Sequence, residues 1–317
     1  MKTLKIILLI VLILGVVAIV GVLIAAISGG FSLPFSNSVA TAVLTDQRFE
    51  ADGIETIDIE LSSSDVTFCR SEDEDFRVVY SGPKAEEEDP LITIAIQSDK
   101  IVVKQRNRIM PTFWGGHREV TIYVPENYSG AVDYNSASGD LKLIEDFRFS
   151  GFVYHVASGD FRCMSLIANK VSLDAASGDY FCESIEANEF TLKATSGDMN
   201  VKKLSGTGTV KVVSGDIRID DYSGGGSINS SSGDIKIFLR EISADLSMHA
   251  ISGDVIVTVT QDLSFQLDIS VTSGGISTDV SLNNAHVSKR STTGSIGDNP
   301  QNLLEIKVTS GDVRLGH

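Results

Sequence analysis

The chain has little cysteine, little tryptophan and few basic residues for its length. Its 317 residues include three cysteines and one tryptophan, and 26 lysines and arginines stand against 42 aspartates and glutamates. Three cysteines cannot supply the disulfide framework that stabilises many small secreted domains. The net charge of −16 argues against nucleic acid and against anionic lipid headgroups as partners.

The motifs of several enzyme classes are also missing. The sequence contains no phosphate-binding glycine loop, no zinc-binding spacing and no nucleophile elbow. Asp133, His155 and Asp174 fall at outward positions of neighbouring repeats, and two carboxylates on one face could act as an acid and a base. A solvated polar face supplies the same residues without any catalytic role. We therefore predict no enzyme activity, no catalytic residue and no cofactor.

One triplet, Ser-Gly-Asp, recurs along most of the chain. Its steps are 18 to 20 residues, and the spacing continues through two degenerate copies, at Gly275 and Ser295, to a late intact copy. A fixed period of this length is typical of repeat proteins whose units bury their apolar faces by stacking. The aspartates of the intact copies are Asp140, Asp160, Asp179, Asp198, Asp216, Asp234, Asp254 and Asp312.

The residues around each triplet alternate between apolar and polar. The first and third residues after the aspartate are mostly apolar, the second is mostly polar, and the residues before the triplet alternate in the same way. This pattern predicts a strand, a tight corner and a second strand in each repeat. We predict an all-β fold, a right-handed parallel β-helix (β-solenoid) of about 19-residue coils. The corner glycines, which permit positive φ, are Gly139, Gly159, Gly178, Gly197, Gly215, Gly233, Gly253 and Gly311.

An earlier copy of the corner, without its glycine, lies at residues 62–68. Beyond it the spacing is lost, but the sequence still predicts strands, separated by acidic loops at 72–75 and 86–89. We interpret residues 44–130 as the N-terminal part or cap of the solenoid and residues 131–317 as its regular part. The predicted strands are residues 76–80, 91–97, 100–105 and 119–124.

An apolar segment precedes the repeats. Residues 6–27 carry no charged or polar side chain, and a helix of this length, about 33 Å, can cross a membrane. Lys2 and Lys5 precede it and no basic residue follows until Arg48, so we predict a cytoplasmic tip at 1–5, a transmembrane helix at 6–27 and a tether at 28–43. A cleaved signal peptide is the alternative. In both cases the solenoid is extracytoplasmic.

The row of corner aspartates is the sharpest candidate for a metal site. Stacked carboxylates could hold Ca²⁺, although each coil offers one aspartate per 19 residues, which is sparse for a calcium-binding repeat. A structural corner is the alternative. Five coils place a cation two residues after the aspartate, and this basic row would offset the repulsion between carboxylates without metal: Lys142, Arg162, Arg218, Lys236 and Arg314.

Two further features have a structural and a functional interpretation. Cys163 and Cys182 fall at the same place in adjacent coils, where they either fill the core as thiols or form a disulfide. An aromatic loop with Phe113, Trp114 and His117 either binds a ligand or covers the open end of the solenoid.

The last residues, 313–317, form a strand with nothing after it. An uncovered final coil would expose backbone donors and acceptors to another chain. This arrangement predicts end-to-end self-association, or a partner that covers this end.

The Ser-Gly-Asp corner between short strands, behind one N-terminal anchor, resembles the DUF4097-type β-strand-repeat family, whose members are called "putative adhesins". The resemblance covers about residues 44–317, and it implies a β-helix at the cell surface but transfers no site residue. We predict a membrane-anchored, non-catalytic binding or scaffold module of the cell envelope. Its partners would be an envelope polymer or a surface or membrane protein. Alternatives are an accessory protein of envelope-stress signalling and a carbohydrate-active enzyme.

Overall fold

The computed structural model describes residues 40–106 and 116–317. The chain divides into two units, Met1–Ala40 and Thr41–His317, and all the strands of the described residues belong to the second unit. Within the described ranges, no helix is long and apolar enough to cross a membrane. The segment predicted to do so, residues 6–27, lies outside those ranges, as does the predicted cytoplasmic tip.

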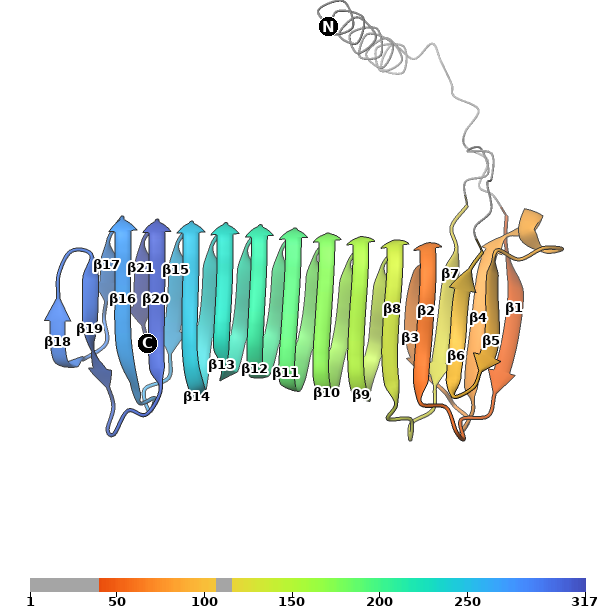
Figure 1. The fold of residues 1–317 in the computed structure, drawn as a ribbon, viewed down its shortest axis with the longest axis horizontal. Coiled ribbons are helices and arrows are strands. Elements are labelled where there is room, and N and C mark those ends of the chain that lie inside the picture. Colours follow the sequence, from red (N-terminus) through yellow and green to blue (C-terminus); the bar gives the residue numbers. More distant parts are fainter. Residues whose placement is uncertain (1–39, 107–115) are drawn as a thin grey trace, which may run out of the picture. The chain divides into compact units, whose positions relative to one another are not determined.

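The second unit is built almost entirely from β-strands (Figure 1). Its first part contains β1 (Thr41–Phe49), β2 (Thr56–Ser63), β3 (Asp65–Arg70), β4 (Phe76–Pro83), the short 3-10 helix η1 (Lys84–Glu86), β5 (Ile92–Gln97), β6 (Lys100–Gln105), β7 (Glu119–Val124) and β8 (Ala131–Ser138). The long central strands are β9 (Leu141–Ser158), β10 (Phe161–Ser177), β11 (Tyr180–Ser196), β12 (Met199–Ser214), β13 (Ile217–Ser232) and β14 (Ile235–Ser252). The last part contains β15 (Val255–Val259), β16 (Phe265–Ser273), β17 (Ile276–Thr278), β18 (Asn283–Val287), β19 (Ser291–Ile296), β20 (Leu303–Ser310) and β21 (Val313–Gly316).

Each central strand, β9 to β14, runs from one Ser-Gly-Asp corner to the next and forms one coil. Neighbouring coils pair in parallel with equivalent positions opposite one another, so that Phe161 faces Leu141 on one side and Tyr180 on the other. Figure 1 shows these strands side by side in one row. The all-β, mostly parallel stack of repeats is therefore confirmed, and its right-handed sense stays a prediction.

The apolar positions of successive coils form one continuous core. From Asp140 to Asp254, the residue after each aspartate is buried, and so is the residue six places before it. Tyr134 and Tyr154, from neighbouring coils, stack with ring centroids 5.3 Å apart. Burial of one large apolar side chain contributes about 1.5–3 kcal/mol. The sequence period is therefore the period of the core.

At the N-terminal end, the order of strands in space differs from their order in the sequence. Strands β2 and β3 pair in parallel with β8 and β9 on one side and with β6 and β7 on the other. Strands β1, β4 and β5 complete this end through antiparallel pairs. The strands predicted between residues 76 and 124 are confirmed, and they share the core of the repeats.

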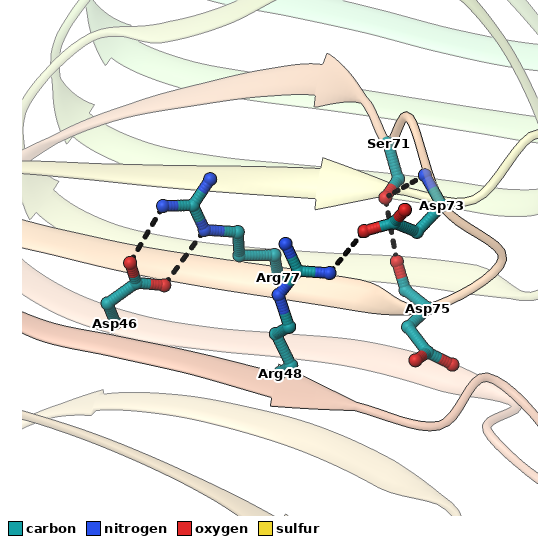
Figure 2. A network of polar contacts seen from close by, with 6 residues as sticks. All are labelled: Asp46, Arg48, Ser71, Asp73, Asp75 and Arg77. Atoms are coloured by element: carbon teal, nitrogen blue, oxygen red, sulfur yellow. Dashed lines mark hydrogen bonds and ion pairs between the residues drawn. The ribbon is translucent and has the colours of Figure 1, made fainter.

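An ion-pair network holds β1 against β4 (Figure 2). The Arg77 guanidinium donates two hydrogen bonds to the Asp46 carboxylate, at 2.8 and 2.7 Å, and these bonds hold the pKa of Asp46 below its ordinary value. Arg48 pairs with Asp73 in the loop before β4, where the Asp73 N–H donates to the Ser71 hydroxyl at 3.3 Å. Strand β1 begins within the range predicted as the tether, and polar contacts account for much of its attachment.

The C-terminal end is interleaved in the same way. Strand β20 lies between β14 and β16, and β21 lies between β15 and β17 (Figure 1). The prediction of an uncovered final coil is therefore wrong, because the last coil is paired on both edges. The antiparallel strands β18 and β19 follow beyond β16. Ser295, predicted as a degenerate corner, lies inside β19.

Candidate functional site

The corner aspartates form a continuous hydrogen-bonded ladder. The Asp160 N–H donates to Asp140 Oδ1 at 3.0 Å, and the equivalent bond, 2.8–3.0 Å long, recurs at each step from Asp65 to Asp312. The ladder ends where the Gly275 N–H donates to Asp312 Oδ1 at 2.8 Å. One oxygen of each of these carboxylates is thus bonded to the backbone of the adjacent coil, as in the local caps that aspartate forms in turns.

The corner glycines lie directly on one another. Gly197 has φ of 129°, and a Cβ atom there would lie 2.2 Å from the Gly178 carbonyl oxygen. Any side chain at this position would therefore clash with the backbone of the preceding coil, in addition to the strain of positive φ. The triplet keeps its glycine for both reasons.

The aspartate row carries no further sign of a metal site. Within residues 40–106 and 116–317, no group of three or more histidine, cysteine, aspartate or glutamate side chains is arranged to hold a metal ion. A calcium ion on the row would have to use the second oxygen of each carboxylate. Calcium binding there stays a prediction.

The basic row only partly matches its predicted role. Arg162 pairs with its own corner aspartate, Asp160, at 3.0 Å. Arg218 pairs instead with Asp220, at 2.8 Å. Within the described part of the chain, Lys142, Lys236 and Arg314 form no ion pair. A direct ion pair between the two rows is thus present at Arg162, and a general offset of the aspartate row by the basic row stays a prediction.

The two aligned cysteines are buried thiols. Cys163 and Cys182 lie opposite each other in β10 and β11, are 5% and 4% exposed, and form no disulfide. Burial raises the pKa of the Cys163 thiol, so its reactive thiolate form is disfavoured. Of the two interpretations, filling of the core is confirmed.

The aromatic loop can be followed only at its end. Phe113 and Trp114 lie outside the described residues. His117 is exposed, with its Nδ1 atom 3.8 Å from Asp65 Oδ2 and its Nε2 atom 3.9 Å from Glu119 Oε2. The ligand-binding and end-covering interpretations of the loop both stay predictions.

Beside His117, a buried carboxylate anchors a segment that the sequence placed in an exposed loop. Glu86 is 2% exposed, its Oε1 atom accepts a hydrogen bond from Arg118 Nε at 3.0 Å, and its Oε2 atom accepts one from the Tyr80 hydroxyl at 2.6 Å. A buried carboxylate needs such partners, because an unpaired charge in the core is costly. Nothing in the acidic run around Glu86 distinguished it from its exposed neighbours.

A shallow hollow on the outer face of four consecutive coils, β9 to β12, combines apolar and basic groups. Its volume is about 350 Å³. Its apolar surface includes Ile144, Met164 and Phe181, which are 50%, 51% and 36% exposed. Large exposed apolar side chains that gather at one place mark binding sites more often than scattered ones do. We call this site the outer hollow, and its other lining residues are Lys142, Leu143, Arg162, Cys163, Cys182, Glu183, Asn200 and Lys202.

Cations surround the apolar part of the outer hollow. The Arg162 guanidinium lies over the Phe181 ring, 4.7 Å from its centroid. Lys202 forms an ion pair with Glu183 at 2.6 Å. The Lys142 ammonium has no hydrogen-bond or ion-pair partner among the described residues. The hollow therefore offers a positive charge beside an apolar surface, in a chain whose net charge is −16.

The sequence contained a signal for this hollow that its interpretation missed. The outward positions of the coils mostly carry polar residues, as Lys202 and Asp220 illustrate. Three successive coils place Ile144, Met164 and Phe181 there instead. A coil-by-coil comparison of outward residues would therefore have located the site.

A larger hollow of about 560 Å³ lies along the return segments of the same coils. Its lining is mostly polar and includes Arg148, Glu186 and a pair of asparagines, Asn169 and Asn188, joined by a hydrogen bond of 3.4 Å. Asparagines stacked in this way satisfy one another along a coil edge. This hollow lacks the exposed apolar side chains that distinguish the outer hollow.

Comparison with known families identifies this arrangement of coils. The family model described as Toastrack DUF4097 matches residues 54–316, which span both interleaved ends and all the corners. The chain belongs to the Toastrack DUF4097 family. No curated protein matches this Toastrack chain.

Solved structures show the same fold at low sequence identity. A structure described as a "putative adhesin" from Parabacteroides distasonis is 11% identical, with a TM-score of 0.55 and coverage of 85% of this chain and 96% of that one. A second structure from the same species, described as a "putative lipid binding protein", is 10% identical, with a TM-score of 0.50 and the same two coverages. Identities this low show that the Toastrack fold is shared, and they assign no site residue.

Proposed function

We propose that this Toastrack protein is a non-catalytic binding module of the cell envelope, with the adhesin-like role that the sequence predicts. The observation that carries the proposal is the outer hollow, where Ile144, Met164 and Phe181 replace polar residues on three consecutive coils. A solenoid built only for structure gains nothing from exposed apolar side chains at these positions. The related structures of this fold are described by what they bind rather than by a reaction.

The proposed location follows from the N-terminal sequence. Residues 6–27 would anchor the chain in the membrane with its N-terminus in the cytoplasm, and the solenoid would lie outside. Its partners would be an envelope polymer or a surface or membrane protein. Nucleic acid is not among them, because the net charge of −16 repels it.

Co-sedimentation with isolated cell envelopes tests this proposal. The Thr41–His317 unit is the suitable protein, because it is compact and the core described above lies within it. We expect saturable recovery in the envelope pellet, equal in calcium and in a chelator if the aspartates serve only the backbone ladder. Loss of binding in chelator would instead favour calcium on the aspartate row.

The same samples test the absence of catalysis. The supernatant is assayed for oligosaccharides released from the envelope during the incubation. We expect no release above that of envelopes alone. Sustained release, or no pelleting in either buffer, would contradict a non-catalytic module that binds the envelope.

A further inference from the structure

We propose that the outer hollow binds a single anionic amphiphile, a lipid-like molecule with a phosphate head and an alkyl tail. This inference rests on the proposed binding function and names its ligand class. The tail would lie over Ile144, Met164 and Phe181, and the phosphate would lie at Lys142 and Arg162. The argument combines the local backbone, the placement of the cations, the size of the hollow and the charge of the whole chain.

A local irregularity of β9 lies beside the apolar surface. Between the pairs Leu143–Cys163 and Asp146–Ser165, β9 has two residues where β10 has only Met164. Such bulges are frequent beside binding sites. Ile144 follows its corner aspartate by four residues, as Met164 does, so both occupy the regular outward position, where they are 50% and 51% exposed.

Two cations lie at one side of this surface. Lys142 and Arg162 are direct register partners in adjacent parallel strands, so their backbones are about 4.8 Å apart. Phe181 is the next register partner along the row. A phosphate can accept hydrogen bonds from both cations, and such charge-assisted bonds are stronger than neutral ones. Arg162, which also pairs with its own corner aspartate, Asp160, would share its guanidinium between that carboxylate and the phosphate while it stays over the Phe181 ring.

Size favours a small amphiphile over a folded protein. The hollow, at about 350 Å³, lies at the lower end of the range of small-molecule pockets, about 300–1,000 Å³. A stable protein interface buries about 800 Å² on each partner. Three exposed apolar side chains provide only the centre of such an interface, and the charged residues that surround them fit a ligand with one head and one tail.

The overall charge favours a single molecule over an anionic membrane surface. A chain with net charge −16 is repelled by an extended anionic surface. Close to the hollow, however, Lys142 has no ion-pair partner among the described residues, and its field acts over about 10 Å at moderate ionic strength. One phosphate can therefore bind where an anionic bilayer would be excluded.

Isothermal titration calorimetry with dodecyl phosphate, below its micelle concentration, tests the proposal on the Thr41–His317 unit. Dodecyltrimethylammonium has the same tail with a cationic head, and inorganic phosphate supplies a head without a tail. We expect dodecyl phosphate to bind with an affinity at least about tenfold above that of either control ligand. Equal affinity for the two dodecyl compounds would overturn the role of the cations, and equal affinity for both phosphates would overturn the role of the tail.

Matched variants locate the binding. Met164→Glu should weaken dodecyl phosphate binding about tenfold or more, because it removes apolar contact and adds a negative charge. Ile251→Glu makes the same change at an exposed apolar residue of another face and should leave the affinity unchanged. Lys142→Gln should lower the preference for the phosphate head, whereas Lys236→Gln, in the same row five coils away from Lys142, should not. Equal effects of the members of either pair would overturn the assignment to the outer hollow.

The outcome for this ligand is separable from the outcome for the binding function. Saturable envelope binding without dodecyl phosphate binding would refute the ligand class and leave the binding module intact. Competition for envelope binding by an acidic peptide but not by dodecyl phosphate would point to a protein partner and overturn the proposal. Amphiphile binding without envelope binding would support the ligand and contradict the envelope role.

Discussion

At the scale of single residues, the Ser-Gly-Asp corner serves two backbones at once. The glycine lets the backbone of the preceding coil approach within a distance that no Cβ allows, and the aspartate accepts an N–H from the following coil. The sequence predicted a structural corner from the period and from the turn chemistry of these residues. It did not reveal that each aspartate bonds to the next coil rather than to its own turn, because that contact joins residues about 19 positions apart.

Substitution of a corner glycine should be strongly destabilising. In Gly197→Ala the new Cβ would lie 2.2 Å from the Gly178 carbonyl oxygen, at a φ of 129°. Strain of this kind costs about 1–3 kcal/mol from the backbone conformation alone, and the clash adds to it. Gly151→Ala is the matched control, because its nearest neighbour would lie 3.9 Å from the added Cβ. Chemical denaturation measures both, and similar unfolding free energies for the two variants would contradict the stacked corner.

The buried carboxylate shows where residue-level prediction failed. Glu86 lies in a run of acidic residues, and its burial depends on Arg118 and Tyr80. Arg118 comes from another part of the sequence, so no local pattern pairs it with Glu86. The outer hollow differs, since Ile144, Met164 and Phe181 broke a local pattern and could have been recognised.

At the scale of strands, the two ends of the solenoid share one device. A coil from outside the regular order inserts into the stack, β2 with β3 at one end and β20 with β21 at the other. The repeat pattern predicts which residues face the core, but every coil carries the same pattern, so it does not specify which coil lies beside which. This is why the element types were predicted correctly and the order at the C-terminal end was not.

Removal of the last coil should therefore affect the whole end of the solenoid. Deletion of residues 303–317 leaves β14 and β16 without their shared partner and removes five buried apolar residues, each worth about 1.5–3 kcal/mol. The total is comparable with the net stability of a domain, about 5–15 kcal/mol. We expect unfolding or aggregation, measured by circular dichroism and light scattering.

Deletion of the exposed strand β18 is the control for that truncation. Every residue of β18 is exposed, and it pairs only with β19, so its loss should change the unfolding midpoint little. If the chain without residues 303–317 stays monomeric and unfolds like the native chain, the inserted position of β20 and β21 is contradicted.

Strand β1 should be the most easily detached strand of the N-terminal end. It pairs only with β4, and Arg77→Gln removes both hydrogen bonds to Asp46. Faster hydrogen exchange in β1 is the expected result, while Arg240→Gln, which breaks the Asp221 pair elsewhere, leaves β1 unchanged. Equal hydrogen exchange of β1 in the two variants would contradict the attachment of β1 through the Arg77–Asp46 pair.

The same pair gives β1 a pH dependence. The pKa of Asp46 is held below its ordinary value. The Arg77–Asp46 pair therefore stabilises β1 fully at a pH above that ordinary value, and this stabilisation is lost as the pH falls through the lowered pKa. Exchange in β1 of the native chain should therefore approach that of Arg77→Gln only in acid.

At the scale of the whole molecule, a stack of similar coils presents rows of outward residues, and the outer hollow gathers three exposed apolar side chains at one place on those rows. The net charge of −16 and the regular corners describe the scaffold, whereas the outer hollow distinguishes this chain from a uniform solenoid. We propose that the module binds the cell envelope through this hollow.

The most direct test compares envelope pelleting of the native Thr41–His317 unit with the Met164→Glu and Ile251→Glu variants. Both variants exchange an exposed apolar residue for glutamate, so stability and net charge change alike, and circular dichroism confirms that each is folded. Pelleting that Met164→Glu loses and Ile251→Glu retains is the predicted result. Equal pelleting of all three proteins would show that the envelope is bound elsewhere or not at all through the outer hollow.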